Sequence, residues 1–159
     1  MKNKSVVLFV LFTLIVTACG GGEEKKESAS SESFKAKVAA KLGLTEFEFE
    51  NGVGPIKEKL NIPAEIDKKM AAEGLKIFES KCMSCHKLDE KYTGPALRDV
   101  TKRRTNEYIM NMILNPEEMT KRHPEARKLL GIHATQMTFQ NVTQEDTRKL
   151  LEYLRSESK

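Results

Sequence analysis

The sequence predicts an all-α fold, and three segments carry that prediction. Apolar residues recur at helical spacing over about 64–80, and again over 105–114 before an Asn-Pro stop. A last helix begins at Thr143, which has acidic residues in the first turn after it. The apolar stripe of this helix consists of Leu150, Leu151 and Leu154. We therefore expect helices from about residue 64 to the end of the chain.

The first eighteen residues form a predicted export signal. Lys2 and Lys4 precede an uncharged, mostly apolar run over 6–16, and small residues then lead to Cys19. The segment before this cysteine, Val-Thr-Ala, resembles a bacterial lipobox, which implies cleavage after residue 18 and a diacylglyceryl group on the Cys19 thiol. An uncleaved anchor is the alternative, but eleven apolar residues are too few for a span of about twenty. Either way we expect an exported, membrane-tethered chain.

The composition of the chain changes between a polar segment, rich in Gly, Glu, Lys and Ser, and the predicted helical domain. Residues 19–33 contain the lipidated cysteine and then Gly, Glu, Lys, Ser and one Ala, which predicts a flexible linker. Residues 34–63 form an N-terminal extension, in which one short helix is expected over 34–42. Further along, Phe47 and Phe49 alternate with Glu, so we expect an extended stretch lying over the domain.

The pentapeptide Cys82-Met83-Ser84-Cys85-His86 carries the strongest chemical signal in the chain. Cys-x-x-Cys followed at once by His is the attachment motif of a c-type haem. Two thiols one helical turn apart can each add to a vinyl group on one edge of the porphyrin, and the next residue places an imidazole beneath the iron. We therefore predict one covalently bound haem c, attached at Cys82 and Cys85 and ligated by His86. A core of about ninety residues is thin, and this large apolar group supplies its centre.

Three other interpretations of these cysteines have less support. A thioredoxin-like dithiol needs the end of a strand in a βαβ unit, and no convincing buried strand run precedes Cys82. A zinc site would have to add His123 and His133, which lie ten residues apart rather than the usual three to five or so. A disulfide between Cys82 and Cys85 would leave the adjoining His86 unexplained.

Net charge argues against a polyanionic partner. Lys and Arg number 27 against 23 Asp and Glu, and cleavage after residue 18 would lower the formal charge from +4 to +2. Two ionised haem carboxylates would bring the total near zero, which excludes nucleic acid as an expected partner. The densest basic run, Lys102-Arg103-Arg104, could pair with those carboxylates, dock an acidic partner or form a solvated helix start.

The helical region, 64–159, resembles a class I cytochrome c domain. Gly74 and Phe78 stand where that family places the small and aromatic residues that cross its last helix. The other side of this crossing would be formed by Leu150, Tyr153 and Leu154. The resemblance implies the class I cytochrome c fold, with helices wrapped around one covalently bound haem.

Downstream of the haem motif, Thr93-Gly94-Pro95-Ala96-Leu97 resembles a loop of the same family. The resemblance implies that the Pro95 carbonyl accepts a hydrogen bond from the His86 imidazole and that Leu97 packs on the porphyrin. This agrees with general chemistry, because a ligating histidine is oriented through its other ring nitrogen.

The sixth iron ligand has several candidates: Met110, Met112, Met119, Met137, His123 and His133. The first two lie in a helical pattern, which favours core packing, and the histidines are expected at surface or loop positions. Met137 lies in the loop before the last helix, where class I cytochromes place their ligand, although the family's usual proline is here Thr138. Met119, expected in a polar loop, is the second choice. We predict Met137 as the ligand.

The predicted function is electron transfer without catalysis, because nothing in the sequence resembles a nucleophile–base pair, a phosphate loop or a second haem motif. By resemblance, the chain passes single electrons from a quinol-oxidising complex to a terminal oxidase or a periplasmic reductase such as nitrous oxide reductase. It would do so on the periplasmic side of a bacterial membrane. The alternatives are a haem sensor or peroxidase-like module with an open sixth position, and a structural lipoprotein with an incidental motif.

Overall fold

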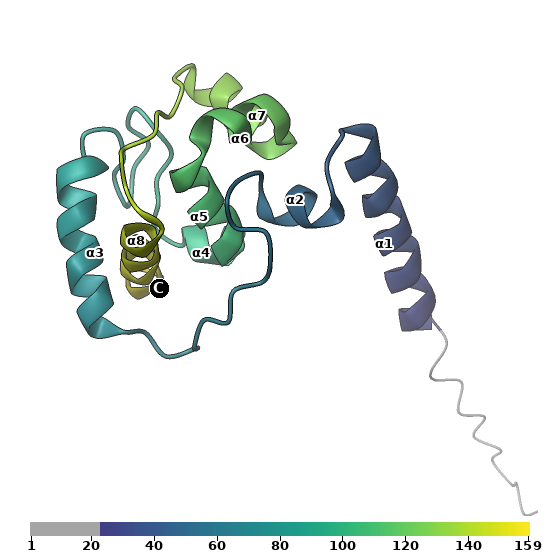
Figure 1. The fold of residues 1–159 in the computed structure, drawn as a ribbon, viewed down its shortest axis with the longest axis horizontal. Helices are drawn as coiled ribbons and strands as arrows, with labels where there is room; N and C mark the ends of the chain where they lie inside the picture. The colour runs from purple at the N-terminus through teal and green to yellow at the C-terminus, as the bar shows by residue number, and fades with distance from the viewer. Residues whose placement is uncertain (1–22) are drawn as a thin grey trace, which may run out of the picture.

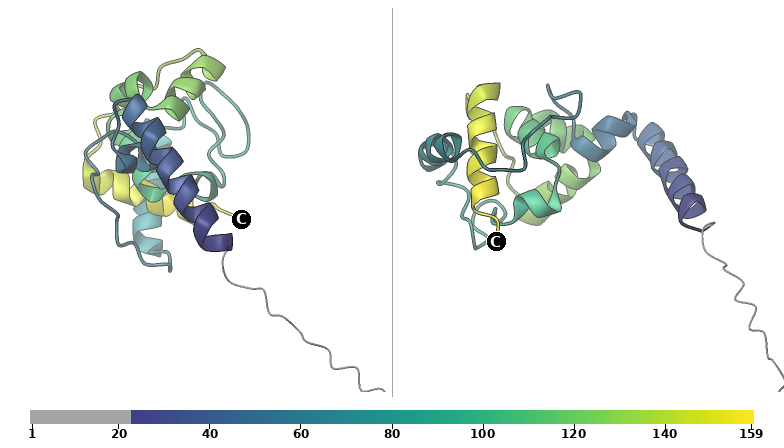
Figure 2. Two further views of the ribbon diagram at one scale, coloured as in Figure 1. Left: turned by 90° about the vertical axis from the view of Figure 1, so that its right-hand side faces the viewer. Right: turned by 90° about the horizontal axis from the view of Figure 1, so that it is seen from below.

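The computed structural model describes residues 23–159, so the predicted signal peptide and Cys19 lie outside the described residues. The described chain is all-helical, as predicted. Its elements are α1 (Glu23–Lys41), α2 (Glu46–Asn51), α3 (Lys68–Lys81), α4 (Val100–Arg103), α5 (Asn106–Leu114), α6 (Pro116–Arg122), α7 (Pro124–His133) and α8 (Gln144–Ser156). Helices α3 to α8 form the body, and α1 projects from it on one side (Figures 1 and 2). Within this part of the chain, no helix has the length and apolar character needed to cross a membrane.

Side-chain caps fix where three of the predicted helices begin. Helix α3 starts after Asp67, whose carboxylate accepts the N–H of Met70, so it begins four residues later than expected. The Thr105 hydroxyl caps α5 in the same way. Thr143 and Asp146 form a reciprocal capping box at the start of α8. These local signals explain why the sequence located the three helices.

Helices α3 and α8 cross in direct backbone contact at Gly74. A Cβ at this position would overlap the carbonyl oxygen of Lys149 and lie 2.6 Å from its carbonyl carbon. One turn further along α3, the Phe78 ring packs against Tyr153 with centroids 5.2 Å apart. This is the crossing that the family resemblance implied, and it places the end of α3 over the core formed by α5 and α8.

Helices α6 and α7 were not predicted from the sequence. Both begin with proline at the first helical position, Pro116 and Pro124, where the missing N–H has no partner to lose. The sequence predicts Pro116 only as the stop of the preceding helix and indicates no role for Pro124, although each proline starts a helix. Met119 consequently lies within α6 rather than in a polar loop.

The N-terminal region differs from the prediction in two places. Helix α1 starts at Glu23, so most of the expected flexible linker is helical; Glu and Lys, which fill much of this segment, have high helix propensity. Residues 46–51 form α2 instead of an extended stretch, because Thr45 and Glu48 build a capping box. A local cap here outweighs the alternating pattern of the two phenylalanines.

The rest of the extension is held against the body through backbone contacts. Val53 and Ile56 are buried, and the Val53 N–H donates to the sulfur of Met119 at 3.0 Å. The N–H of Leu60 donates to the buried Glu107 carboxylate at 2.8 Å. On the other side, Lys35 of α1 pairs with Glu50 of α2 at 2.8 Å. The extension is therefore part of the folded unit and is bound to α5 through Glu107 and to α6 through Met119.

Candidate functional site

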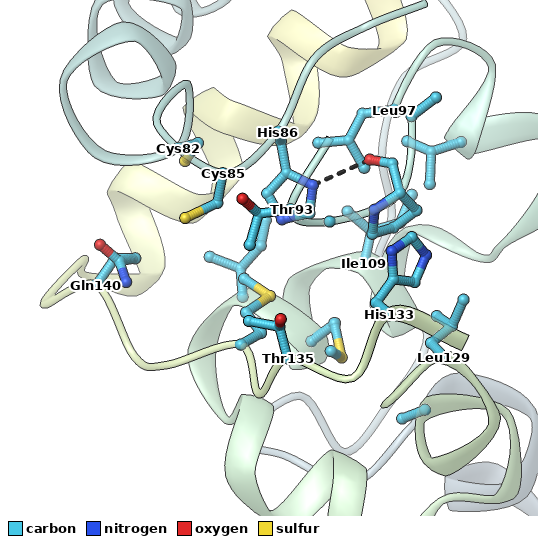
Figure 3. Close-up of a pocket in the computed structure, with 18 of the residues that line it drawn as sticks. Cys82, Cys85, His86, Thr93, Leu97, Ile109, Leu129, His133, Thr135 and Gln140 are labelled. Atoms are coloured by element: carbon cyan, nitrogen blue, oxygen red, sulfur yellow. Dashed lines mark hydrogen bonds between the residues drawn. The ribbon is translucent and has the colours of Figure 1, made fainter. Parts of the chain in front are cut away.

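The predicted haem-attachment residues lie in a tight turn at the end of α3. The N–H of Cys82 still bonds to the carbonyl of Phe78, and the N–H groups of Cys85 and His86 both bond to the carbonyl of Cys82. This turn places both thiols and the imidazole along one side of a cavity (Figure 3). Helix α3, anchored on α8 by the crossing at Gly74, therefore positions the whole motif.

His86 is held by the loop that follows the motif. Its Nδ1 lies 3.1 Å from the carbonyl oxygen of Pro95, and because a carbonyl only accepts, Nδ1 carries the proton. Gly94 makes this approach possible: a Cβ there would lie 2.7 Å from the same nitrogen. Burial lowers the pKa of His86, with the Pro95 bond acting against it. The imidazole is thus neutral, with Nε2 left as the free ligating atom.

The cavity in front of His86 has a volume of about 290 Å³ and is lined mostly by apolar side chains from α3, α5, α7, α8 and two loops. Leu97 lines it, as predicted for a residue packing on the porphyrin. The charged residues that line it are all cationic: Lys81, Arg103 and Arg104. Such a cavity suits a large apolar molecule that carries negative charge.

The structure separates the candidate methionines. Met110 and Met119 are buried at 1% and 0% exposure and do not line the cavity, and the Met119 sulfur is already bonded to the extension. Met112 lines the cavity but lies on α5 and packs against a buried cluster that includes Tyr108 and Met119. Met137 lines the cavity from the irregular segment 134–143. It is therefore the methionine that combines access to the cavity with a loop position.

Comparison with known proteins decides the family. The sequence matches the family model described as Cytochrome c over residues 71–158. The chain belongs to the cytochrome c family. The solved cytochrome c from Rhodothermus marinus is 43% identical, with a TM-score of 0.65, over 69% of this chain and 93% of that one. Two engineered forms of it, one bound to a carbene intermediate, are each 42% identical over 69% of this chain and 94% of theirs, with TM-scores of 0.65 and 0.63. Comparison with curated proteins gave no match.

A cytochrome c domain binds one covalent haem c and serves as an electron carrier, and this cytochrome's cavity fits that group. A porphyrin is apolar over both faces and carries two carboxylates, which suits apolar walls and cationic lining residues. Tyr108 and His133 line the cavity as residues, and each also has a buried polar atom, Oη and Nδ1, without a hydrogen-bond partner among the described residues.

The two downstream histidines do not occupy surface or loop positions as expected. His123 is 2% exposed, and its Nε2 donates to the carbonyl of Phe49 at 3.0 Å, so it belongs to the core behind the cavity. His133 is half-buried in the last turn of α7 and lines the cavity. His133 was expected in a loop because α7 was not predicted from the sequence. The spacing of Leu129, Leu130 and His133 after Pro124 was the available signal.

The basic run Lys102-Arg103-Arg104 covers the end of α4 and the residue after it, and both arginines bind other groups of the protein. Arg103 donates to the carbonyls of Ala96 at 3.1 Å and Arg98 at 2.9 Å, while Arg104 pairs with Glu125 at 2.8 Å. Both arginines also line the cavity. Both arginines therefore combine contacts to the protein with a position at the cavity, and they do not form a purely solvated helix start.

The rival uses of the cysteines find no support in the geometry. Burial raises the pKa of the Cys82 thiol to about 11, whereas a redox dithiol needs a lowered one. No group of three or more His, Cys, Asp or Glu side chains within 23–159 lies close enough to hold a metal ion. Cys82 and Cys85 are both free thiols.

Proposed function

We propose that this cytochrome carries single electrons with a haem joined to Cys82 and Cys85 by thioether bonds. His86 and Met137 supply its two axial ligands. The observation that carries this proposal is that all four side chains line one cavity, with His86 held by Pro95. The bound haem supplies one-electron ferric–ferrous chemistry, with a potential raised by histidine–methionine ligation.

The chain's own residues then do three things. The Pro95 carbonyl fixes the tautomer of His86 and the direction of its free nitrogen. The irregular segment that carries Met137 also lines the cavity, and Figure 3 shows its residue Thr135 across from His86. Apolar side chains from α5 and α8 exclude water from between them. Neither axial ligand has to leave, so no substrate reaches the iron and the chain acts as a carrier rather than an enzyme.

Absorption spectra of the haem-loaded protein test the ligand assignment. Ferric haem with methionine sulfur gives a weak red charge-transfer band, which we expect in the wild type and not in Met137→Ala. Met119→Leu is the matched control and should keep the band, because Met119 lies in the core. A band that persists in Met137→Ala and disappears in Met119→Leu would contradict the assignment.

Carbon monoxide separates the carrier from a sensor or peroxidase-like module with an open sixth position. A haem with both axial positions filled should resist carbon monoxide in the reduced state, whereas Met137→Ala should bind it. Rapid binding by the wild type would favour the sensor. Absence of covalent haem after expression with the maturation machinery would favour a structural lipoprotein.

Membrane attachment is the second part of the proposal. We infer cleavage after residue 18 and lipid on Cys19, which would tether the protein on the periplasmic side of a bacterial membrane. Helix α1 begins four residues after Cys19, and its 19 residues span about 28 Å. It would hold the domain away from the membrane as a rod. Replacing Cys19 with Ala should release the haem protein from the membrane fraction and abolish labelling by fatty acid.

The partners would be redox proteins of the same membrane. We propose a quinol-oxidising complex as donor and a terminal oxidase or periplasmic reductase, such as nitrous oxide reductase, as acceptor. Stopped-flow reduction of the haem protein by quinol-supplied membranes would test the donor. Failure of every such membrane preparation to reduce it would contradict this assignment while leaving the carrier function intact.

A further inference from the structure

The segment that carries Met137 runs from α7 to α8 over residues 134–143 (Figure 1). Within the described chain, its residues 135–142 make no backbone–backbone hydrogen bond. The side-chain hydrogen bonds of 135–142 stay inside the segment, except those of the Gln136 amide, which reaches Thr120 of α6. Among the described residues, Gln136 therefore supplies the only hydrogen-bonded link between 135–142 and another element.

Both hydrogens of the Gln136 amide nitrogen have a partner. Nε2 lies 3.0 Å from the carbonyl oxygen of Met137 and 2.8 Å from Thr120 Oγ1. A carbonyl only accepts, so the amide nitrogen, and not Oε1, must face Met137. The Thr120 hydroxyl can donate its one hydrogen to the carbonyl of Pro116 at 3.0 Å, and its oxygen then accepts from Gln136. One amide thus joins the backbone of Met137 to α6.

Helix α6 provides a fixed partner for this amide. Thr120 is buried, and the side chain of the preceding residue, Met119, is buried completely. The Met119 sulfur accepts the N–H of Val53 in the N-terminal extension at 3.0 Å. Thr120 and Gln136 both line the cavity, so the bond between them lies beside the space that the porphyrin would fill. The Gln136 amide therefore holds the backbone of Met137 in place relative to the walls of the cavity.

We propose that Gln136 is a positioning residue for the sixth iron ligand: its amide holds the Met137 backbone so that the sulfur stays at the iron. This inference rests on the proposed ligation by Met137. An axial methionine competes with any external ligand for one position on the iron. Without the amide, the segment gains conformational freedom whenever the sulfur leaves, and this favours the external ligand. Loss of the Gln136 amide should therefore make the ferric haem bind an external ligand more tightly.

Imidazole titration of the ferric, haem-loaded protein measures this competition, because imidazole replaces the methionine and removes the weak red charge-transfer band. Gln136→Leu should lower the dissociation constant of imidazole roughly fivefold, as the loss of one ordinary hydrogen bond would. Thr120→Val removes the same link from the other side and should have a similar effect. Because the two substitutions break one bond, the double variant should bind imidazole no more tightly than Gln136→Leu alone.

Two matched variants separate positioning from a general loss of stability. Thr120→Ser keeps the hydroxyl, and Met119→Leu changes the neighbouring residue on α6 while leaving both partners of the hydrogen bond in place. Both variants should keep the wild-type dissociation constant of imidazole. An unchanged constant in Gln136→Leu, additive effects in the double variant, or an equal fall in Met119→Leu would overturn the inference.

A crystal structure of the wild-type haem protein decides the question if the variants do not mature. Gln136 Nε2 within about 3.2 Å of both Thr120 Oγ1 and the Met137 carbonyl oxygen supports the inference, and a longer separation from either overturns it. Failure of the proposed function is a different outcome. In that case the wild-type spectrum would lack the charge-transfer band, or the band would persist in Met137→Ala.

Discussion

The side chain of Asn111 pairs with both backbone groups of Ile56. Its Oδ1 accepts the Ile56 N–H at 2.9 Å, and its Nδ2 donates to the Ile56 carbonyl at 3.1 Å. The same Nδ2 also reaches the carbonyls of Asn51 at 3.0 Å and Gly52 at 3.2 Å. One fully buried amide on α5 thus replaces the backbone partners that an irregular segment lacks. It joins the N-terminal extension to the helix that forms one wall of the haem cavity.

Replacing Asn111 with Leu should therefore be strongly destabilising. The substitution keeps the branching and the number of side-chain heavy atoms but leaves several buried backbone groups without partners, and we expect a loss of roughly 3 kcal/mol in the free energy of unfolding. Denaturant unfolding of the haem-loaded protein measures it. Asn115→Leu is the control, because Asn115 makes only one long bond to the extension, 3.4 Å to Val53, and should lose less than about 1 kcal/mol. Equal losses in the two variants would contradict the role of Asn111.

Two glycine substitutions should change stability in opposite directions. Gly74→Ala would force α3 and α8 apart, because the new methyl group overlaps the Lys149 carbonyl, and a loss of about 3 kcal/mol is expected. Gly131→Ala, in α7, meets no atom within 4 Å and should gain up to about 1 kcal/mol from helix propensity. Thermal unfolding of both variants beside the wild type provides the comparison. A tolerated Gly74→Ala would show that the helices can separate without loss.

Met119→Leu should weaken the protein without changing the iron. The substitution removes the sulfur that accepts the Val53 N–H and leaves that donor buried, at a cost of about 1 kcal/mol. The red charge-transfer band should stay, as should the reduction potential. Unfolding and spectra recorded on the same sample separate the two effects. Loss of the band in this variant would place Met119 at the iron.

Stability should fall in mild acid because of His123. Burial lowers the pKa of this histidine; Arg104 lowers it as well, while the Phe49 carbonyl and Glu125 act in the other direction. The unfolded chain, with a histidine pKa of about 6.5, then binds more protons than the folded chain. The free energy of unfolding should therefore fall as pH drops below about 6.5, and level off once the lowered pKa is passed.

Replacing His123 with Gln isolates this contribution. The other histidines remain in both proteins, so the difference in the pH dependence of unfolding belongs to His123. We expect the free energy of unfolding of the variant to depend less steeply on pH between about 7.5 and about 5. Identical slopes would mean that protonation of the buried ring is not what acid acts on.

The segment that carries Met137 is bounded by two residues in the left-handed region, Ala134 at φ 51° and Asn141 at φ 56°. Asparagine tolerates this conformation, but alanine does so at a cost of about 1 kcal/mol. Ala134→Gly should therefore raise the free energy of unfolding by up to about 1 kcal/mol, measured by denaturant. Asn141→Gly, the matched control, should change it much less. A destabilised Ala134→Gly would show that this turn needs a side chain.

Local chemistry made part of this molecule predictable from the sequence. The pentapeptide from Cys82 to His86 is contiguous, so it can be recognised in the sequence without knowledge of any distant contact. The caps at Thr105 and Thr143 act on N–H groups three residues away, which is why α5 and α8 were located correctly. The crossing at Gly74 was expected only through resemblance to the family.

Tertiary structure decided what depends on residues far apart in the chain. The buried His123 donates a hydrogen bond to the carbonyl of Phe49, 74 residues earlier. The sulfur of Met119 accepts a hydrogen bond from the N–H of Val53, 66 residues earlier. The sequence by itself determined that the chain attaches haem and is helical, because those signals lie within single turns. Which of the methionines and downstream histidines line the cavity depended on packing between segments whose pairing no local pattern encodes.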